Sequence, residues 1–186
     1  PIPEEQIDSM LEPYNLSPST PILERWWNWL SNVVLHWDWG SSPVGADVNA
    51  EVGYRIWVSA QLLLLATILS IVIGVAIGVY TASRQYKAGD RIWQGISIIA
   101  MNTHIVVASI VVVGFGLKIN EWTGQRVFYV IGARSIHVEG FFPTLIDILQ
   151  HLTLPTIAMV FISYAGYHMT QRTLLLDNLN ADYVRT

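Results

Sequence analysis

The stretch IWVSAQLLLLATILSIVIGVAIGVYTAS, from Ile56 to Ser83, contains no charged residue and decides the class of fold. It is longer than the roughly 20 apolar residues that a helix needs to cross a hydrocarbon core about 30 Å thick. Two more charge-free stretches follow, from Ile92 to Leu117 and from Ile148 to Gln171. The 186-residue chain is 52% apolar and 13% charged, with a mean hydropathy of +0.41. These features predict an all-α membrane protein, a polytopic bundle with transmembrane helices at about 57–80, 93–117 and 152–173.

The first 55 residues have a different character. Acidic residues outnumber basic ones there, and five of the eight tryptophans lie between Trp26 and Trp39. Apolar side chains from Ile22 to Trp37 recur at helical spacing, and indole rings are favoured where acyl chains meet headgroups. We therefore expect residues 1–55 to form an external segment with an amphipathic Trp-rich helix, and residues 56–186 to form the transmembrane domain. The helix lies either on the lipid surface or against the rest of the protein.

A row of small residues marks one face of the first predicted span. Its members recur at every fourth position and are Ala66, Ser70, Gly74 and Gly78. In lipid, helices associate through close van der Waals packing, which small residues permit. We expect this face to pack against another helix of the bundle, in preference to dimerisation of two copies through it.

Polar residues interrupt the second and third predicted spans. Asn102, Thr103 and His104 lie early in the second span, and Tyr164 and Tyr167 lie in the third. Polar groups at membrane depth need protein partners or water. The candidates for lining a translocation pathway are Asn102, His104, Tyr164 and Tyr167. Hydrogen bonding to a neighbouring helix is the alternative interpretation.

Lysine and arginine are densest beside two ends of the predicted spans. These residues are Arg84, Lys87, Arg91, Arg172 and Arg185. Cytoplasmic flanks of membrane spans carry the excess of positive charge. The density predicts that residues 83–91 and 178–186 are cytoplasmic and that residues 1–54 and 120–142 face outward.

The sequence carries no signature of a cofactor or of bond chemistry. A net charge of −4 without a basic stripe argues against nucleic acid as a partner. The absence of cysteine excludes disulfides and thiolate metal sites within this sequence. No Walker A loop, hydrolase motif or dinucleotide-binding turn is present, so we expect no catalytic residue and no cofactor. Asp147 and His151 have a spacing that suits a metal, but two ligands are too few, and a helix-start carboxylate near a histidine is the favoured interpretation.

The most specific motifs lie near the C-terminus. The stretch HLTLP (His151–Pro155) opens the third span, Arg172 closes it, and a run ending in DYVRT (Asp182–Thr186) follows. Upstream, HWDWGSS (His36–Ser42) stands in the place of a G-D-[FW]-G-x-S loop. Together these motifs resemble the first permease subunit of bacterial dipeptide, oligopeptide and nickel ABC importers, over nearly the whole chain. The chain departs from that pattern at His36, where the family usually has glycine, and it lacks the proline that the family often carries near residues 102–104.

The resemblance implies a permease subunit of the bacterial cytoplasmic membrane that forms the pathway for peptides and catalyses no bond chemistry. It implies as partners a second permease subunit, two ABC ATPase subunits, an extracytoplasmic substrate-binding protein and the lipid bilayer. Residues 174–186 would begin the cytoplasmic EAA loop, whose coupling helix docks on the ATPase. The coupling residues would be Asp182, Tyr183, Arg185 and Thr186. The family has one span before the matching region and two after it, so the chain is expected to be a fragment of a longer permease.

Three other functions stay open at this point. Nickel or another small solute can be carried by the same architecture. An intramembrane enzyme would have to use Asp147, His151 or His168. An ion-coupled carrier should have a buried carboxylate on its pathway, and the three predicted spans lack one.

Overall fold

The computed structural model describes residues 3–14, 16–42 and 44–179. These residues contain helices and no β-strand, and they divide into two compact units, Pro1–Ser59 and Ala60–Thr186. Three helices are long and apolar enough to cross a membrane: α3 (Val48–Ser83), α5 (Ile105–Thr123) and α6 (Phe141–Leu179). The predicted fold class, an all-α polytopic membrane protein, is confirmed.

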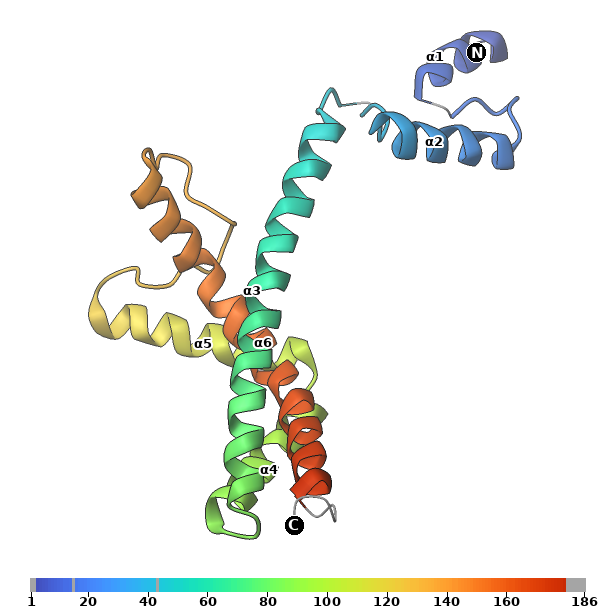
Figure 1. The fold of residues 1–186 in the computed structure, drawn as a ribbon. Coiled ribbons are helices and arrows are strands. Elements are labelled where there is room, and N and C mark those ends of the chain that lie inside the picture. The colour runs from blue at the N-terminus through green and yellow to red at the C-terminus, as the bar shows by residue number, and fades with distance from the viewer. Residues whose placement is uncertain (1–2, 15, 43, 180–186) are drawn as a thin grey trace. The chain divides into compact units, whose positions relative to one another are not determined.

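The first unit consists of short helices followed by the beginning of α3. It contains α1 (Glu4–Leu11), the 3₁₀ turn η1 (Glu12–Tyr14) and α2 (Ile22–His36) (Figure 1). Helix α2 ends where Trp37 adopts a left-handed conformation with φ of 56°, and the N–H of Trp37 donates back to the carbonyl oxygen of Val33 at 3.2 Å. The Trp-rich segment is therefore helical, whereas its position on lipid or on protein stays a prediction.

The second unit is built around α6. Helix α3 continues through this unit to Ser83, and a short turn leads to α4 (Ala88–Asn102). Helices α4 and α5 both pack on α6 (Figure 1). The apolar core consists of Ala100, Tyr164 and Ala165, surrounded by half-buried Ile77, Trp93, Ile96 and Phe161. Two of the three central residues are alanines because close helix approach, and not apolar burial, drives helix association in lipid.

The span predicted at about 93–117 is not one continuous helix. Helix α4 ends at Asn102 and α5 begins at Ile105, and the two helices run in different directions (Figure 1). Thr103 and His104 between them are extended, with ψ angles of 125° and 140°. His104 caps α5, because its Nδ1 accepts from the N–H of Val106 at 3.3 Å. Local side-chain hydrogen bonds thus replace the backbone bonds that a continuous helix would make.

The helices that contain the first and third predicted spans are longer than those spans. Helix α3 begins at Val48 and α6 extends from Phe141 to Leu179, because helical hydrogen bonding continues beyond the apolar stretch on which the predictions of about 57–80 and 152–173 rest. Pro155 lies inside α6 and not at its start. Proline has no N–H, so one backbone hydrogen bond of α6 is missing at this position.

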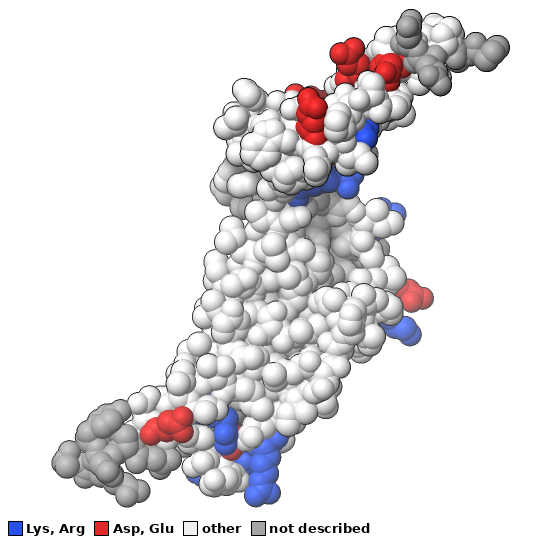
Figure 2. All heavy atoms as spheres, turned by 90° about the vertical axis from the view of Figure 1, so that its right-hand side faces the viewer, with Lys and Arg blue, Asp and Glu red and all other residues white. Residues whose placement is uncertain are grey.

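The surface of the second unit suits a hydrocarbon environment. Large apolar side chains such as Leu64, Val72 and Ile110 are exposed on α3 and α5. Figure 2 shows a broad uncharged area, with one group of Lys and Arg side chains at the lower end of the view and others higher up. An exposed apolar surface of this extent is typical of contact with lipid or with further membrane helices.

Candidate functional site

A buried polar network joins three helices at one end of the second unit. The polar network has two neighbouring hydrogen-bonded parts: one contains Asp90, Gln94 and Arg172, and the other contains Thr81, Ser97, Tyr164 and His168. Its three α4 residues are spaced by four and three positions, and its three α6 residues by four, so each set lies along one helix face. Thr81 lies in the last turn of α3 and adds its hydroxyl group to the polar network.

Asp90 is the charged centre of the polar network and is completely buried. Nε and Nη2 of Arg172 donate to its two carboxylate oxygens at 2.8 and 2.9 Å. Nε2 of Gln94 donates at 2.7 Å and the backbone N–H of Tyr86 at 3.0 Å. The hydrogen bond from Arg172 outweighs desolvation and lowers the pKa of Asp90 to about 2, so the carboxylate is charged at neutral pH. Bidentate pairing by arginine gives this contact a fixed geometry.

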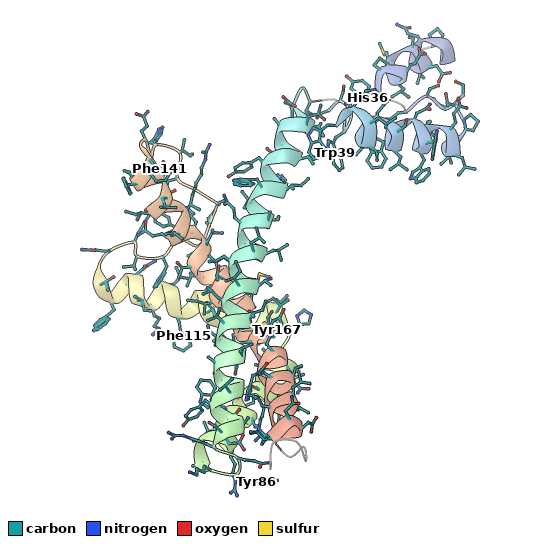
Figure 3. The ribbon with its side chains drawn as sticks, in the orientation of Figure 1. His36, Trp39, Tyr86, Phe115, Phe141 and Tyr167 are labelled. Atoms are coloured by element: carbon teal, nitrogen blue, oxygen red, sulfur yellow. The ribbon has the colours of Figure 1, made fainter. Side chains whose placement is uncertain are left out.

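The turn between α3 and α4 is held against Asp90. Tyr86 lies in this turn at the lower end of the view in Figure 3, with a left-handed φ of 64° and an exposed side chain. Its backbone N–H is directed to Asp90 Oδ2. A single carboxylate therefore fixes the α3–α4 turn, α4 and α6 relative to one another.

His168 forms the second junction of the polar network. Its Nδ1 lies 2.7 Å from Ser97 Oγ on α4, and its Nε2 lies 3.0 Å from Thr81 Oγ1 on α3. The residue is completely buried, and both ring nitrogens are engaged. Because the ring has no exposed atom to offer a substrate, the geometry favours a structural role for His168 over the role in an intramembrane enzyme.

The polar network was not predicted from the sequence. The spacing of Asp90, Gln94 and Ser97 was a usable signal, because it puts three polar residues on one face of a membrane helix. The sequence indicates Arg172 as a cytoplasmic charge at the end of a span and as part of the C-terminal motif, but not as the partner of a carboxylate. Its partner Asp90 lies in another helix, so only the fold brings the two together.

The row of small residues is buried, and its two glycines face α6. All four of its members, Ala66, Ser70, Gly74 and Gly78, are buried. A Cβ atom added to Gly74 would lie 2.6 Å from Tyr167 Cβ, and one added to Gly78 would lie 2.7 Å from Gln171 Cβ. At Gly74 and Gly78, the backbones of α3 and α6 therefore approach so closely that even the methyl group of alanine would clash. The contribution of the row to assembly of a complex stays a prediction.

The four candidate pathway residues lie in three different environments. Asn102 and His104 are exposed at the break between α4 and α5. Tyr167 is 40% exposed on α6 (Figure 3) and borders a shallow groove that also includes Ser163 and Thr170. Tyr164 is instead buried in the α4–α6 core, 3.4 Å from Ser97 Oγ. Three of the four therefore reach a surface, and Tyr164 does not.

Asp147 fastens the loop at residues 124–140 to α6. Its carboxylate accepts from the N–H of Ser135 at 2.7 Å and from Ser135 Oγ at 2.6 Å. His151 Nδ1 donates to the carbonyl oxygen of Asp147 at 2.8 Å, and the ring of Tyr129 stacks on His151 with a centroid distance of 4.3 Å. Both side chains are occupied in holding the loop. Within residues 3–14, 16–42 and 44–179, no three His, Asp or Glu side chains come close enough together to hold a metal ion.

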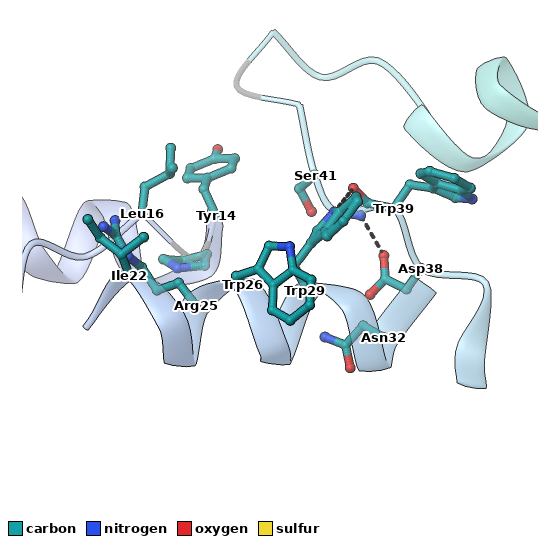
Figure 4. A pocket seen from close by; sticks show the side chains of 12 residues that line it. Tyr14, Leu16, Ile22, Arg25, Trp26, Trp29, Asn32, Asp38, Trp39 and Ser41 are labelled. Carbon is teal, nitrogen blue, oxygen red and sulfur yellow. Dashed lines mark hydrogen bonds between the residues drawn. The ribbon is translucent and has the colours of Figure 1, made fainter. Parts of the chain in front are cut away.

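The first unit contains an aromatic pocket of about 600 Å³ (Figure 4). Trp26, Trp29 and Trp39 line it together with Arg25 and Asp38. Trp29 Nε1 donates to the carbonyl oxygen of Trp39 at 3.4 Å, and the N–H of Gly40 donates to the Asp38 carboxylate at 2.9 Å. The DWGSS motif is thus folded back on α2, and this fold creates one wall of the pocket.

The predicted coupling residues lie outside the part of the chain that the structure describes. They are Asp182, Tyr183, Arg185 and Thr186. Helix α6 leads toward them and is described as far as Leu179.

Comparison with known proteins identifies a family and several relatives. The family described as "Binding-protein-dependent transport system inner membrane component" matches residues 74–186. The chain is 36% identical over 99% of its length to the oligopeptide transport system permease protein OppB of Mycobacterium tuberculosis (strain ATCC 25618 / H37Rv), of which it covers 56%. It is 30% identical over 96% of its length to the oligopeptide transport system permease protein AppB of Bacillus subtilis (strain 168), of which it covers 54%.

A more distant relative is the probable D,D-dipeptide transport system permease protein DdpB of Escherichia coli (strain K12). The identity is 23% over 89% of this chain and 52% of that protein. The chain therefore spans about half the length of the curated relatives that it matches.

Proposed function

Because the chain belongs to the family of binding-protein-dependent transport system inner membrane components, we propose that it is part of a permease subunit of an ABC importer for peptides. The observation that carries the proposal is the 36% identity, over 99% of the chain, to a protein named as an oligopeptide transport permease. The motifs HLTLP and DYVRT support the same assignment from the sequence.

In this proposal the subunit lies in the bacterial cytoplasmic membrane and catalyses no bond chemistry itself. It pairs with a second permease subunit, two ABC ATPase subunits hydrolyse ATP, and an extracytoplasmic binding protein delivers the peptide. Closure of the ATPase pair moves the coupling elements, and the spans tip between outward-open and inward-open arrangements as rigid bodies. Residues 182–186 begin the coupling element.

The break between α4 and α5 is a candidate location for part of the translocation pathway. Non-helical backbone is tolerated at membrane depth only where protein buries it or where it borders water. Asn102 and His104 are exposed at this break, and Tyr167 borders the shallow groove that also includes Ser163 and Thr170. We assign Asn102, His104 and Tyr167 to the lining of the pathway. Tyr164 is left out because it is buried between α4 and α6.

Reconstitution of the full-length protein tests this function. The complete permease would be purified with its partner permease, its ATPase subunits and its binding protein, and reconstituted in liposomes. We expect ATP-dependent uptake of labelled oligopeptides that requires the binding protein. Uptake of Ni²⁺ without uptake of peptides would instead favour the nickel alternative and contradict the peptide assignment.

A further inference from the structure

We propose that Asp90, Arg172 and His168 are positioning residues for energy coupling: they lock α3 and α4 to α6, so that displacement at the end of α6 moves all three helices together. This inference rests on the proposed function, because it concerns how motion of the coupling element reaches the spans.

The ion pair lies close to the segment that contains the predicted coupling residues. Arg172 lies about two helical turns before Leu179, where the description of α6 ends and the segment with the predicted coupling residues begins. Its partner Asp90 lies in the first turn of α4, and Asp90 also binds the turn that connects α3. A force applied at the end of α6 therefore reaches the ends of the other two helices through this one carboxylate.

The contact between Asp90 and Arg172 is also stiff. Both oxygens of the Asp90 carboxylate are held, by the forked guanidinium of Arg172, by Gln94 and by the N–H of Tyr86. A bidentate arginine–carboxylate pair is directional, and Asp90 is completely buried. Rotation of α4 against α6 would leave a buried charge without its partner, so the pair resists such rotation.

A second contact between the helices lies one helical turn from Arg172. His168 lies four residues before Arg172 on α6 and contacts Ser97 on α4 and Thr81 on α3. Two ties along one helix face fix register as well as distance. The apolar contact between these helices is centred on Ala100, Tyr164 and Ala165 and is not directional. The directional hydrogen bonds of the polar network therefore add to the register that apolar packing sets.

The test compares coupling in four variants of the full-length importer. Arg172→Gln removes the ion pair, Arg172→Lys keeps the charge but loses the forked geometry, and Ser97→Ala removes one contact of His168. Arg91→Gln is the matched control, because Arg91 is an exposed arginine beside Asp90. Each complex is reconstituted, its amount is measured, and peptide uptake per ATP hydrolysed is determined with saturating binding protein.

We expect uptake per ATP to fall by about fivefold or more in Arg172→Gln, as loss of a coupling free energy between two sites implies. The fall should be smaller in Arg172→Lys and Ser97→Ala and absent in Arg91→Gln. A role limited to stability would lower the amount of complex and leave the ratio unchanged. An unchanged ratio in the Arg172 variants would overturn the proposal, as would an equal fall in Arg91→Gln.

Two further outcomes are decisive. If Arg172→Gln does not assemble, Arg172→Lys and Ser97→Ala test the proposal in its place. A wild-type ratio of peptide uptake to ATP hydrolysis in both of them would overturn it. The wild-type complex tests the proposed function separately: absence of binding-protein-dependent peptide uptake contradicts that function. Wild-type uptake with unchanged variant ratios contradicts only the positioning role.

Discussion

At the residue scale, Gly74 shows how a missing side chain determines helix packing in this protein. A Cβ atom at this position would meet the Tyr164 carbonyl oxygen at 2.7 Å as well as Tyr167 Cβ at 2.6 Å. The carbonyl belongs to the backbone of α6 and cannot rotate away. Gly95 on α4 is different, because a Cβ there would meet no atom within 4 Å.

This difference yields a paired prediction. Gly74→Ala should destabilise the full-length permease by about 1–3 kcal/mol, because it forces two backbones apart in a close-packed contact. Gly95→Ala should be neutral or stabilise by about 0.4–1 kcal/mol, because alanine fits a helix with open space around it. Thermal unfolding of the purified complex in detergent measures both. A Gly74→Ala complex as stable as the Gly95→Ala complex would contradict the close contact between α3 and α6.

The sequence predicts which residues share a helix face when they recur at helical spacing. It does not predict which residues of different helices contact each other. Ala66, Ser70, Gly74 and Gly78 repeat every fourth position, so their common face follows from helix geometry alone. Asp90 and Arg172 are 82 residues apart, and no local pattern connects them. Tyr164 was assigned to the pathway from its polarity, but the hydroxyl meets Ser97 inside the helix contact.

At the scale of elements, the loop at residues 124–140 is fastened at both ends by single side chains. Asn120 at the end of α5 accepts from the N–H groups of Val127 and Phe128 at 2.9 Å each and donates to the Phe128 carbonyl oxygen at 2.7 Å. Asp147 on α6 holds Ser135 near the other end. The loop therefore has a defined conformation without any regular structure of its own.

Removing one of these contacts should release the loop. Asp147→Ala leaves the N–H and hydroxyl of Ser135 without their acceptor, which costs roughly 1–3 kcal/mol and should raise amide exchange of residues 130–140 by about tenfold. Hydrogen–deuterium exchange with mass spectrometry measures this change. Glu139→Ala serves as the control, because Glu139 is an exposed acidic residue of the same loop. Equal exchange in the two variants would show that Asp147 does not hold the loop.

The sequence predicted the existence of the membrane helices better than the residues at which they begin and end. A charge-free stretch reports which segment suits hydrocarbon, so α3 and α6 were found, but it carries no information on where helical hydrogen bonding stops. The break at Thr103 and His104 was missed because neither residue is glycine or proline. Polar side chains that bond to nearby backbone end α4 there instead, which is visible only in the fold.

At the scale of the whole molecule, the proposed importer requires contact between this chain and an ATPase. The residues predicted to begin that contact, 182–186, follow α6 in the sequence and lie outside the described residues. The resemblance of DYVRT to the start of an EAA loop is the basis for this prediction.

Reversing the charge of Arg185 should weaken this contact without preventing insertion into the membrane. In the full-length complex, Arg185→Glu is expected to lower retention of the ATPase subunits by about fivefold or more, because charge reversal at a docking surface places like charges or unpaired groups together. Co-purification and peptide uptake measure the effect. Arg126→Glu is the control, since Arg126 is an exposed arginine in a loop predicted to face outward. Wild-type retention and uptake in Arg185→Glu would refute the coupling assignment.

Cysteine labelling can assign the two sides of the membrane, because these 186 residues contain no cysteine and any cysteine elsewhere in the full-length protein can be replaced beforehand. The density of Lys and Arg predicts that the α3–α4 turn is cytoplasmic. The ion pair between Asp90 and Arg172 brings this turn to the same end of the second unit as the C-terminal part of α6, so both should face the same side. Val44→Cys and Lys87→Cys would each be introduced alone into the full-length protein, at exposed positions outside the apolar spans. An impermeant maleimide added to intact cells should label Val44→Cys, whereas Lys87→Cys should react only after permeabilisation. Protein without an introduced cysteine provides the background. Labelling of both positions in intact cells would contradict the predicted topology, and labelling of Lys87→Cys alone would invert it.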